Sequence, residues 1–363
     1  MSVFETPLSL KIDTLIVGQG LAGSILAWKL LERGQRILVV DRDEPVTSSK
    51  VAAGLLTPIT GTGFSIPGDL STRLNFAKQF YWDAEEKTGQ RFFHHTRIAR
   101  IFRNAAEKAK FDARKSADPA SWEIYAEHLN IDTAKFHAPH SGIEMKEGGW
   151  LNVPLFLEST RQHLLERAAY AIASVDSRDV LAGSEIGAAH GVRWKRVEAD
   201  RVIFAQGWQG NQNRFFDWVP MNPAAGDILD LDIPELEGEK RIINRGGWLL
   251  PIGSGRFRAG STYRHDFAET IPNAGGRIEV LKKLDEITQC DFRVIGHKVG
   301  IRPIIHRSRV FFGKHHSFPE VNFFNGLGSK GVLNGPWHAD RMVAHLLNDE
   351  DIPEQCDLNV LSH

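Results

Sequence analysis

Cysteine is scarce in this chain of 363 residues, which contains only Cys290 and Cys356. The two stand far apart and form no CxxC pair, so we expect no disulfide framework and a reducing, cytoplasmic compartment. Long apolar runs are also missing, since no stretch approaches the roughly 20 residues that a membrane-spanning helix needs. Because no basic segment followed by a long apolar run marks the start of the sequence, we expect neither a membrane span nor a signal peptide.

An excess of charge of one sign is absent as well. The 44 Lys and Arg residues balance 45 Asp and Glu residues, which gives a formal net charge of −1. This balance predicts no general attraction to nucleic acid or to an anionic membrane surface. The adjacent pairs His94-His95 and His315-His316 are poor metal sites, because neighbouring residues on a strand point to opposite faces. We therefore expect no metal.

A dinucleotide-binding fingerprint is present at the start of the chain, in DTLIVGQGLAGSILAWKLLERGQRILVVDRD over 13–43. The apolar run 14–17 predicts a buried strand, helical spacing predicts a helix over 21–33, and 37–40 predicts a second strand. Between strand and helix lies G-x-G-x-x-G. Apolar periodicity also predicts helices over 72–89, 155–169, 276–289 and 336–348, and strands within 91–102, 142–150, 170–205 and 222–265.

Each residue of the fingerprint has a physical task. Gly18 permits a tight turn, Gly20 lets the backbone approach a pyrophosphate, and Gly23 lets the helix pack close to the strand. The helix N-terminus favours the negative charge of the pyrophosphate. Asp41, at the end of the second strand, can accept hydrogen bonds from a ribose hydroxyl. The fingerprint predicts a Rossmann-type domain but does not separate NAD from FAD.

The stretch after the second strand, SSKVAAGLL over 48–56, is rich in small side chains that let backbone lie against a flat ligand. With this stretch, the chain resembles the D-amino-acid oxidase superfamily of flavoenzymes, in the branch that contains glycine oxidase and sarcosine oxidase. Asp41 stands where the family usually has Glu. Later segments extend the resemblance over nearly the whole chain: RVIFAQGW (201–208), WLLP (248–251), FRAGST (257–262), VGIRPIIHRSRVFFG (299–313) and NFFNGLGSKGVLNGPWHA (322–339).

The resemblance implies an α/β fold in which a Rossmann-type FAD-binding domain is interleaved with an α+β substrate domain carrying an antiparallel sheet. The FAD-binding domain would take 1–80, 147–214 and 297–363, and the substrate domain 81–146 and 215–296. FAD would be bound non-covalently, because no Cys follows the Arg-Pro pair where sarcosine oxidases attach the flavin. Cofactor contacts are expected from Gly18, Gly20, Leu21, Ala22, Gly23, Asp41, Arg42, Ser49, Ala53, Gly54, Leu55, Gly207, Gly326, Gly328, Ser329, Lys330 and Gly331.

The resemblance also implies the catalytic residues. Arg302, the Arg of G-I-R-P, would pair with a substrate carboxylate through two N–H groups; the alternative is an ordinary structural arginine. Trp248 stands where several amino-acid oxidases have a carboxylate-binding Tyr, and the alternative is a core aromatic. Arg258 falls near a Lys that helps oxygen react in sarcosine oxidases, or else it is a solvated strand residue. Tyr263 and His265 are further pocket candidates.

We therefore expect an FAD-dependent oxidoreductase that acts on a small-molecule amine or amino acid. Hydride would pass from the α C–H to flavin N5, the imine product would hydrolyse, and oxygen or another acceptor would reoxidise the flavin. One alternative is a tRNA-wobble-uridine-modifying oxidase, because LGSKG (327–331) resembles LGSRG in such an enzyme, although the chain has no basic surplus. A non-catalytic flavin-binding subunit of a larger complex is the other.

Overall fold

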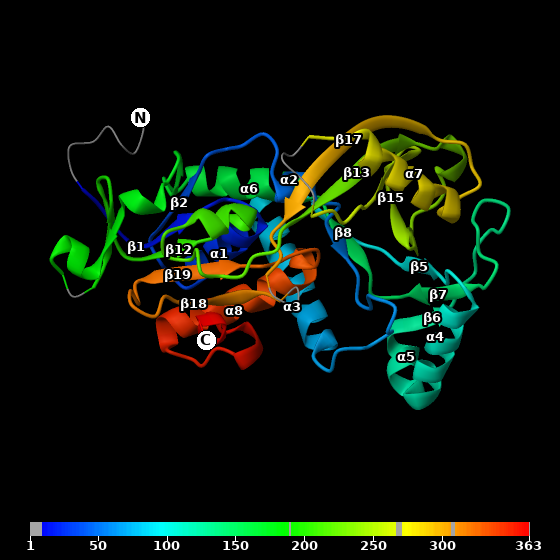
Figure 1. Cartoon of the computed structure of the whole chain (residues 1–363), viewed down its shortest axis with the longest axis horizontal. Helices are drawn as coiled ribbons and strands as arrows, with labels where there is room; N and C mark the ends of the chain where they lie inside the picture. The colour runs from blue at the N-terminus through cyan, green and yellow to red at the C-terminus, as the bar shows by residue number, and fades with distance from the viewer. Residues whose placement is uncertain (1–8, 189, 266–270, 306–308, 363) are drawn as a thin grey trace.

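The computed structural model describes residues 9–188, 190–265, 271–305 and 309–362, so residues 306–308 of the G-I-R-P segment lie outside the described part. The chain forms two lobes, each built around an eight-stranded sheet (Figure 1). We call the lobe with the N-terminal strand the first lobe and the other the second lobe. The mixed α/β architecture with several sheets confirms the expected fold class.

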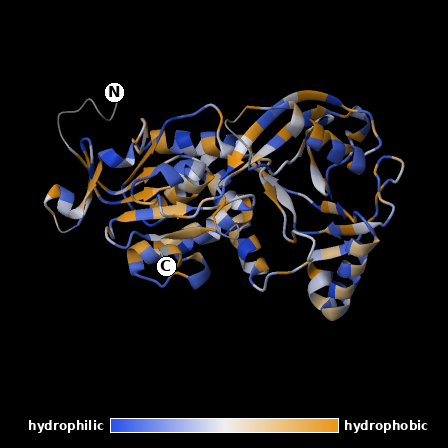
Figure 2. Ribbon diagram, viewed as in Figure 1, coloured by the Kyte–Doolittle hydropathy of each residue, from blue (hydrophilic) through white to orange (hydrophobic). Residues whose placement is uncertain are grey.

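The sheet of the first lobe has a parallel centre, as the fingerprint predicted. β1 pairs in parallel with β2 and β12, β2 pairs with β9, and β12 pairs with β19. The central strands are mostly buried and apolar, and Figure 2 shows the hydrophobic residues gathered along them. The strands are β1 (Leu10–Val17), β2 (Ile37–Asp41), β9 (Tyr170–Ile172), β10 (Val180–Ala182), β11 (Val192–Trp194), β12 (Val197–Phe204), β18 (Phe311–Lys314) and β19 (Val321–Asn325).

The helices of the first lobe pack against each other beside this sheet. α1 contacts α6 and α8, and α3 contacts α8. The helices are α1 (Leu21–Glu32), α2 (Ser48–Val51), α3 (Leu70–Thr88), α6 (Val153–Leu165) and α8 (Gly331–Asn348), with short 3-10 turns at Ser177–Asp179, Gly183–Ile186, Gly207–Gln212, Glu354–Cys356 and Leu358–Ser362. The predicted α1 and α3 are confirmed to within a few residues, whereas α8 begins earlier than expected.

The early start of α8 has a clear physical reason. The helix contains Pro336, which has no N–H to donate to the carbonyl of Val332 one turn earlier. The hydroxyl of Tyr81 on α3 donates to that carbonyl at 3.0 Å, and the contact is buried. The interaction satisfies the carbonyl that proline leaves free, so the helix continues through the proline and its N-terminus reaches Gly331.

Replacing Tyr81 by phenylalanine should therefore destabilise the protein. The carbonyl of Val332 would stay buried without a donor, which lowers the free energy of unfolding by about 1–3 kcal/mol. Tyr170→Phe is the matched control, because the buried hydroxyl of Tyr170 has no hydrogen-bond partner among the described residues. Chemical denaturation of the two variants measures the difference. Equal stabilities of both variants would contradict the role of Tyr81.

The second lobe contains the expected antiparallel sheet. Its strands run in the order β17 (Arg293–Arg302), β13 (Ala224–Asp232), β16 (Arg256–Gly260), β15 (Gly247–Gly253), β14 (Ile242–Arg245), β5 (Ile98–Ile101), β7 (Gly142–Met145) and β6 (Ala126–His128). Only the pairing of β14 with β5 is parallel among the pairs of this described sheet. Helix α7 (Ala274–Ile287) packs on β13 and β15. A separate small sheet joins β3 (Leu55–Leu56), β8 (Gly149–Leu151) and β4 (Phe93–His95).

Two helices of the second lobe were not expected from the sequence, α4 (Ala105–Ala117) and α5 (Pro119–Tyr125). Only Glu107 and Phe111 are buried on α4, so the helix lacks the broad apolar stripe that periodicity detects. A start signal was present, because the side chain of Asn104 accepts from the backbone N–H of Glu107. The capping residue could therefore have indicated the helix where hydrophobicity did not.

Two of the expected domain boundaries fall inside a helix or a strand. Residue 80 lies within α3, and residue 297 lies within β17, which pairs with β13 over nearly its whole length. Figure 1 shows β17 running from the second lobe toward the first. The division of the chain into an FAD-binding and a substrate domain at those residues stays a prediction.

Candidate active site

A cavity of about 660 Å³ is lined by residues of both lobes. Its walls come from the carboxyl ends of β1, β2 and β12 in the first lobe and from β13, β15 and β17 in the second. Ligands of open α/β sheets bind at this edge, beyond the carboxyl ends of parallel strands. The topology therefore places the fingerprint and the G-I-R-P segment on one cavity.

The glycine turn after β1 has the geometry that a pyrophosphate requires. Gly18 has φ +105°, and a Cβ there would lie 2.6 Å from the carbonyl oxygen of Ala205. A Cβ on Gly23 would lie 1.9 Å from the carbonyl oxygen of Gly18, so only glycine lets α1 approach the turn. The N-cap of α1, Gly20, has no side chain to cap the helix, and the hydroxyl of Ser49 accepts from the backbone N–H of Leu21 at 2.9 Å. The other N–H groups of the first turn can receive a phosphate.

Asp41 lies at the end of β2, on the wall of the cavity. Its Oδ2 accepts from the backbone N–H of Gln19 at 2.7 Å, and its Oδ1 accepts from the backbone N–H of Asp43 at 2.7 Å. These bonds fix the carboxylate, and each oxygen keeps a further lone pair for a hydroxyl. The arrangement suits a ribose.

A second glycine-rich turn leads into α8 on the other side of the cavity. Gly326 and Gly328 have φ +86° and +55°, in the left-handed region that favours glycine. The N-cap of α8, Lys330, makes no capping hydrogen bond through its side chain. The positive end of the α8 dipole therefore lies at the cavity, where it favours an anion.

The structure brings together nearly all the residues expected to contact a cofactor. Those that line the cavity are Gly18, Gly20, Leu21, Ala22, Asp41, Arg42, Ser49, Ala53, Gly54, Leu55, Gly207, Gly328, Ser329 and Gly331. Gly23, Gly326 and Lys330 are not among the described residues that line it, and the first two shape the turns instead. Sequence reasoning missed the loop 173–178 after β9 and Gln209. The parallel pairing of β9 with β2 brings this loop to the same edge of the sheet as Asp41.

Arg302 ends β17 with its guanidinium in the cavity wall. Nη1 donates to the carbonyl oxygen of Thr262 at 3.1 Å, and Nη2 donates to Oγ of Ser261 at 2.6 Å. A Cβ on Gly226 would lie 2.1 Å from Nη2, so glycine at that position makes room for the side chain. Burial lowers the pKa of Arg302, while Tyr263 and Asp227 act to raise it. A guanidinium stays charged under these conditions.

The other candidates for catalysis take different positions. Trp248 lines the cavity, and its indole lies against Gly260, where a Cβ would approach the ring to 2.7 Å. Arg258 is not among the described lining residues, and its Nε lies 3.3 Å from Oδ1 of Asp230. The ring of Tyr263 lies 5.6 Å from the guanidinium carbon of Arg302 and is half exposed. His265 is exposed, 5.4 Å from Tyr263 between ring centroids.

The comparison with protein families settles the class. The family model for FAD-dependent oxidoreductases matches residues 13–346. The chain belongs to this family. FAD is thus the cofactor of this oxidoreductase, and the unhindered glycine turn, the fixed Asp41 and the N-terminus of α8 fit a dinucleotide with an anionic centre.

Several known proteins are similar to this oxidoreductase. The tRNA 5-methylaminomethyl-2-thiouridine biosynthesis bifunctional protein of Actinobacillus pleuropneumoniae serotype 3 (strain JL03) is 22% identical over 96% of this chain and 58% of that protein. Among solved structures, iminodiacetate oxidase from Chelativorans sp. BNC1 has a TM-score of 0.77 at 18% identity, over 94% of this chain and 97% of that one. Glycine oxidase from Geobacillus kaustophilus has a TM-score of 0.77 at 16% identity, over 94% and 96%. These solved structures share the fold.

Across the described ranges, no helix is both long and apolar enough to cross a membrane. Within the same ranges, no three His, Cys, Asp or Glu side chains are grouped so that they could hold a metal ion. Cys290 and Cys356 are both free and buried.

Proposed function

We propose that this FAD-dependent oxidoreductase oxidises a small amine that carries a carboxylate, such as an amino acid or an N-substituted glycine. The observation that carries the proposal is the guanidinium of Arg302 in the wall of the cavity, at the end where the second lobe contributes Trp248, Ser261 and Gly226. Two of the solved neighbours, glycine oxidase and iminodiacetate oxidase, are named for substrates that carry a carboxylate. Their names support the substrate class.

The hydrogen bonds of Arg302 leave one edge of the guanidinium for a ligand. Its described acceptors are the carbonyl oxygens of Ala225 and Thr262, at Nη1, and Oγ of Ser261, at Nη2. A guanidinium has five N–H donors, so the Nε–H and one Nη2–H remain available among the described contacts. On one edge of a guanidinium, the Nε–H and an Nη2–H lie side by side and match the two oxygens of a carboxylate.

The roles of the residues follow from this geometry. Arg302 holds the carboxylate and so fixes the direction of the α-carbon, while the indole of Trp248 forms an apolar wall beside it and excludes water. FAD, when bound, accepts the hydride from the α C–H. No basic side chain is required for that step if the substrate binds as a neutral amine. The product is an imine, which water hydrolyses to a carbonyl compound and ammonia or an amine.

A substrate screen without oxygen tests the proposal. We expect glycine, sarcosine, proline or a D-amino acid to bleach the flavin of the purified holoenzyme. The matched controls are methylamine, dimethylamine and pyrrolidine, which lack the carboxylate and should react far more slowly at equal concentration, because they cannot pair with Arg302. A flavin that dithionite reduces but that no amino acid bleaches would instead favour a non-catalytic flavin-binding subunit.

A second candidate function is oxidation of a modified uridine in tRNA. The curated relative named for tRNA modification supports it, since its similarity covers nearly all of this chain. The chain spans 58% of that relative's length, and its net charge of −1 provides no basic surplus for RNA. Binding of tRNA that weakens steeply with added salt would favour this candidate over the amino-acid reaction.

A further inference from the structure

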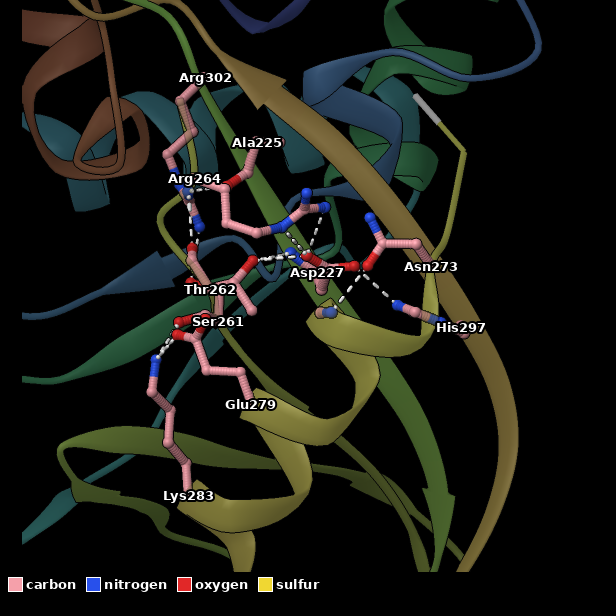
Figure 3. Close-up of polar contacts among 11 residues, drawn as sticks. Ala225, Asp227, Ser261, Thr262, Arg264, Asn273, Glu279, Lys283, His297 and Arg302 are labelled. Atoms are coloured by element: carbon pink, nitrogen blue, oxygen red, sulfur yellow. Dashed lines mark hydrogen bonds and ion pairs between the residues drawn. The ribbon is translucent and has the colours of Figure 1, made fainter. Parts of the chain in front are cut away.

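Asp227 lies on β13 and contacts the segment 261–264, which holds Arg302 (Figure 3). Its carboxylate is fully buried. Its Oδ2 accepts from the hydroxyl of Thr262 at 2.5 Å and from Nη2 of Arg264 at 3.0 Å. Its Oδ1 lies 2.8 Å from Nε2 of His297. A buried carboxylate needs such partners, and here both of its oxygens have them.

The surroundings of Asp227 keep it ionised. Burial acts to raise the pKa of its carboxyl, but the hydrogen bonds from Thr262, His297 and Arg264 hold that pKa below its ordinary value. The space is also tight, because a Cβ on Gly276, in the first turn of α7, would lie 2.2 Å from Oδ1. The carboxylate therefore has one defined position.

The contacts form a continuous path from Asp227 to Arg302. Thr262 is held on two sides, since its hydroxyl bonds Asp227 while its carbonyl oxygen accepts from Nη1 of Arg302. The backbone N–H of Asp227 also donates to the Thr262 hydroxyl at 2.9 Å. Two residues further on, the backbone of Arg264 pairs with Ala225 in both directions, at 2.8 and 3.0 Å. The segment 261–264 is thus fixed along β13, with Oγ of Ser261 facing the guanidinium.

We propose that Asp227 is a positioning residue for substrate binding. Asp227 holds Thr262 and Arg264 in place. The segment so fixed carries the carbonyl oxygen of Thr262 and the hydroxyl of Ser261, and these two groups orient the guanidinium of Arg302. The free edge of Arg302 is then directed into the cavity before the substrate arrives. This inference rests on the proposed function of Arg302, and it assigns to Asp227 no contact with the substrate.

The test measures carboxylate binding separately from turnover. Acetate is titrated into the holoenzyme without an amine substrate, and the change in the flavin spectrum gives its affinity. Asp227→Asn should weaken acetate binding by about tenfold or more, because small misplacements of a binding group have effects of this size. Asp232→Asn is the matched control on the same strand, since Asp232 pairs with Arg293 at 2.8 Å, far from segment 261–264 in the hydrogen-bond network. Flavin content and acetate affinity should be unchanged in the control.

Substitutions of Thr262 keep the test informative if Asp227→Asn does not fold. Valine has the shape of threonine but no hydroxyl, so Thr262→Val should lose acetate affinity as Asp227→Asn does. Serine keeps the hydroxyl, so Thr262→Ser should bind acetate as tightly as the wild type. In an Arg302→Ala background, Thr262→Val should have no further effect, because the path acts only through Arg302. Wild-type acetate affinity in Thr262→Val would overturn the role of Asp227. Equal affinity in wild type and Arg302→Ala would overturn the proposed function as well, so the two failures are distinguishable.

Discussion

The Arg302→Ala variant is expected to remain yellow but to need far more substrate. Its KM for the carboxylate-bearing amine should rise by about 100-fold or more, because each lost charge-assisted hydrogen bond is worth about 1.5–3 kcal/mol. FAD should be retained, since the glycine turns and Asp41 that fit the dinucleotide come from other elements. Steady-state kinetics with the amino acid found in the screen, together with the flavin spectrum, measure both effects.

Arg302→Lys is the matched control for this prediction. Lysine keeps the positive charge but lacks the planar pair of N–H groups, so its KM should lie between those of wild type and Arg302→Ala. A substrate without a carboxylate should react equally with all three proteins. An unchanged KM for the amino acid in Arg302→Ala would remove Arg302 from the binding site.

The second large effect concerns the cofactor. Gly23→Ala is expected to yield nearly colourless protein, because the added Cβ would lie 1.9 Å from the carbonyl oxygen of Gly18, which is main chain and cannot move aside. Overpacking of this kind costs up to roughly 3 kcal/mol. If the whole cost is borne by the turn that binds the cofactor, FAD binding becomes about 100-fold weaker. The ratio of flavin to protein absorbance after purification measures the loss.

Gly238→Ala provides the matched control for the cofactor prediction. A Cβ at Gly238 meets no described atom within 4 Å, and the residue is exposed. This variant should carry a full complement of FAD. Full flavin content in Gly23→Ala would mean that α1 can shift without disturbing the pyrophosphate position.

Much of the first lobe could be predicted from the sequence because its signals are local. The run of strand, glycine turn, helix and strand from Leu10 to Asp41 lies within one βαβ unit, whose glycines are needed for steric reasons. The early start of α8 could not be predicted in this way. It depends on Tyr81, which is far from Val332 in the sequence and becomes its partner only when α3 and α8 pack.

In the candidate site, too, residues in local motifs could be predicted from the sequence, whereas residues that depend on contacts between distant segments could not. The glycine turns and Arg302 were found because a motif fixes their residue types, and the cavity brings them together. Arg258 lies off the described cavity wall because it sits two residues before Gly260 on β16, where its side chain meets Asp230. Asp227 gave no local signal, since its partners Thr262 and His297 come from two other strands or their ends. The role proposed for it follows from tertiary contacts alone.

The course of the chain between the lobes has a consequence for how substrate enters. The chain passes from the first lobe to the second after α3, returns at β8 and α6, leaves again toward β13, and comes back through β17. Two lobes can swing about a hinge only if few chain segments connect them, whereas here the chain crosses between the lobes several times. In addition, α2 of the first lobe contacts β17 of the second lobe directly. Large swinging of one lobe against the other is therefore restrained. Entry of substrate and release of product are therefore expected to depend on small local displacements of the residues that line the cavity.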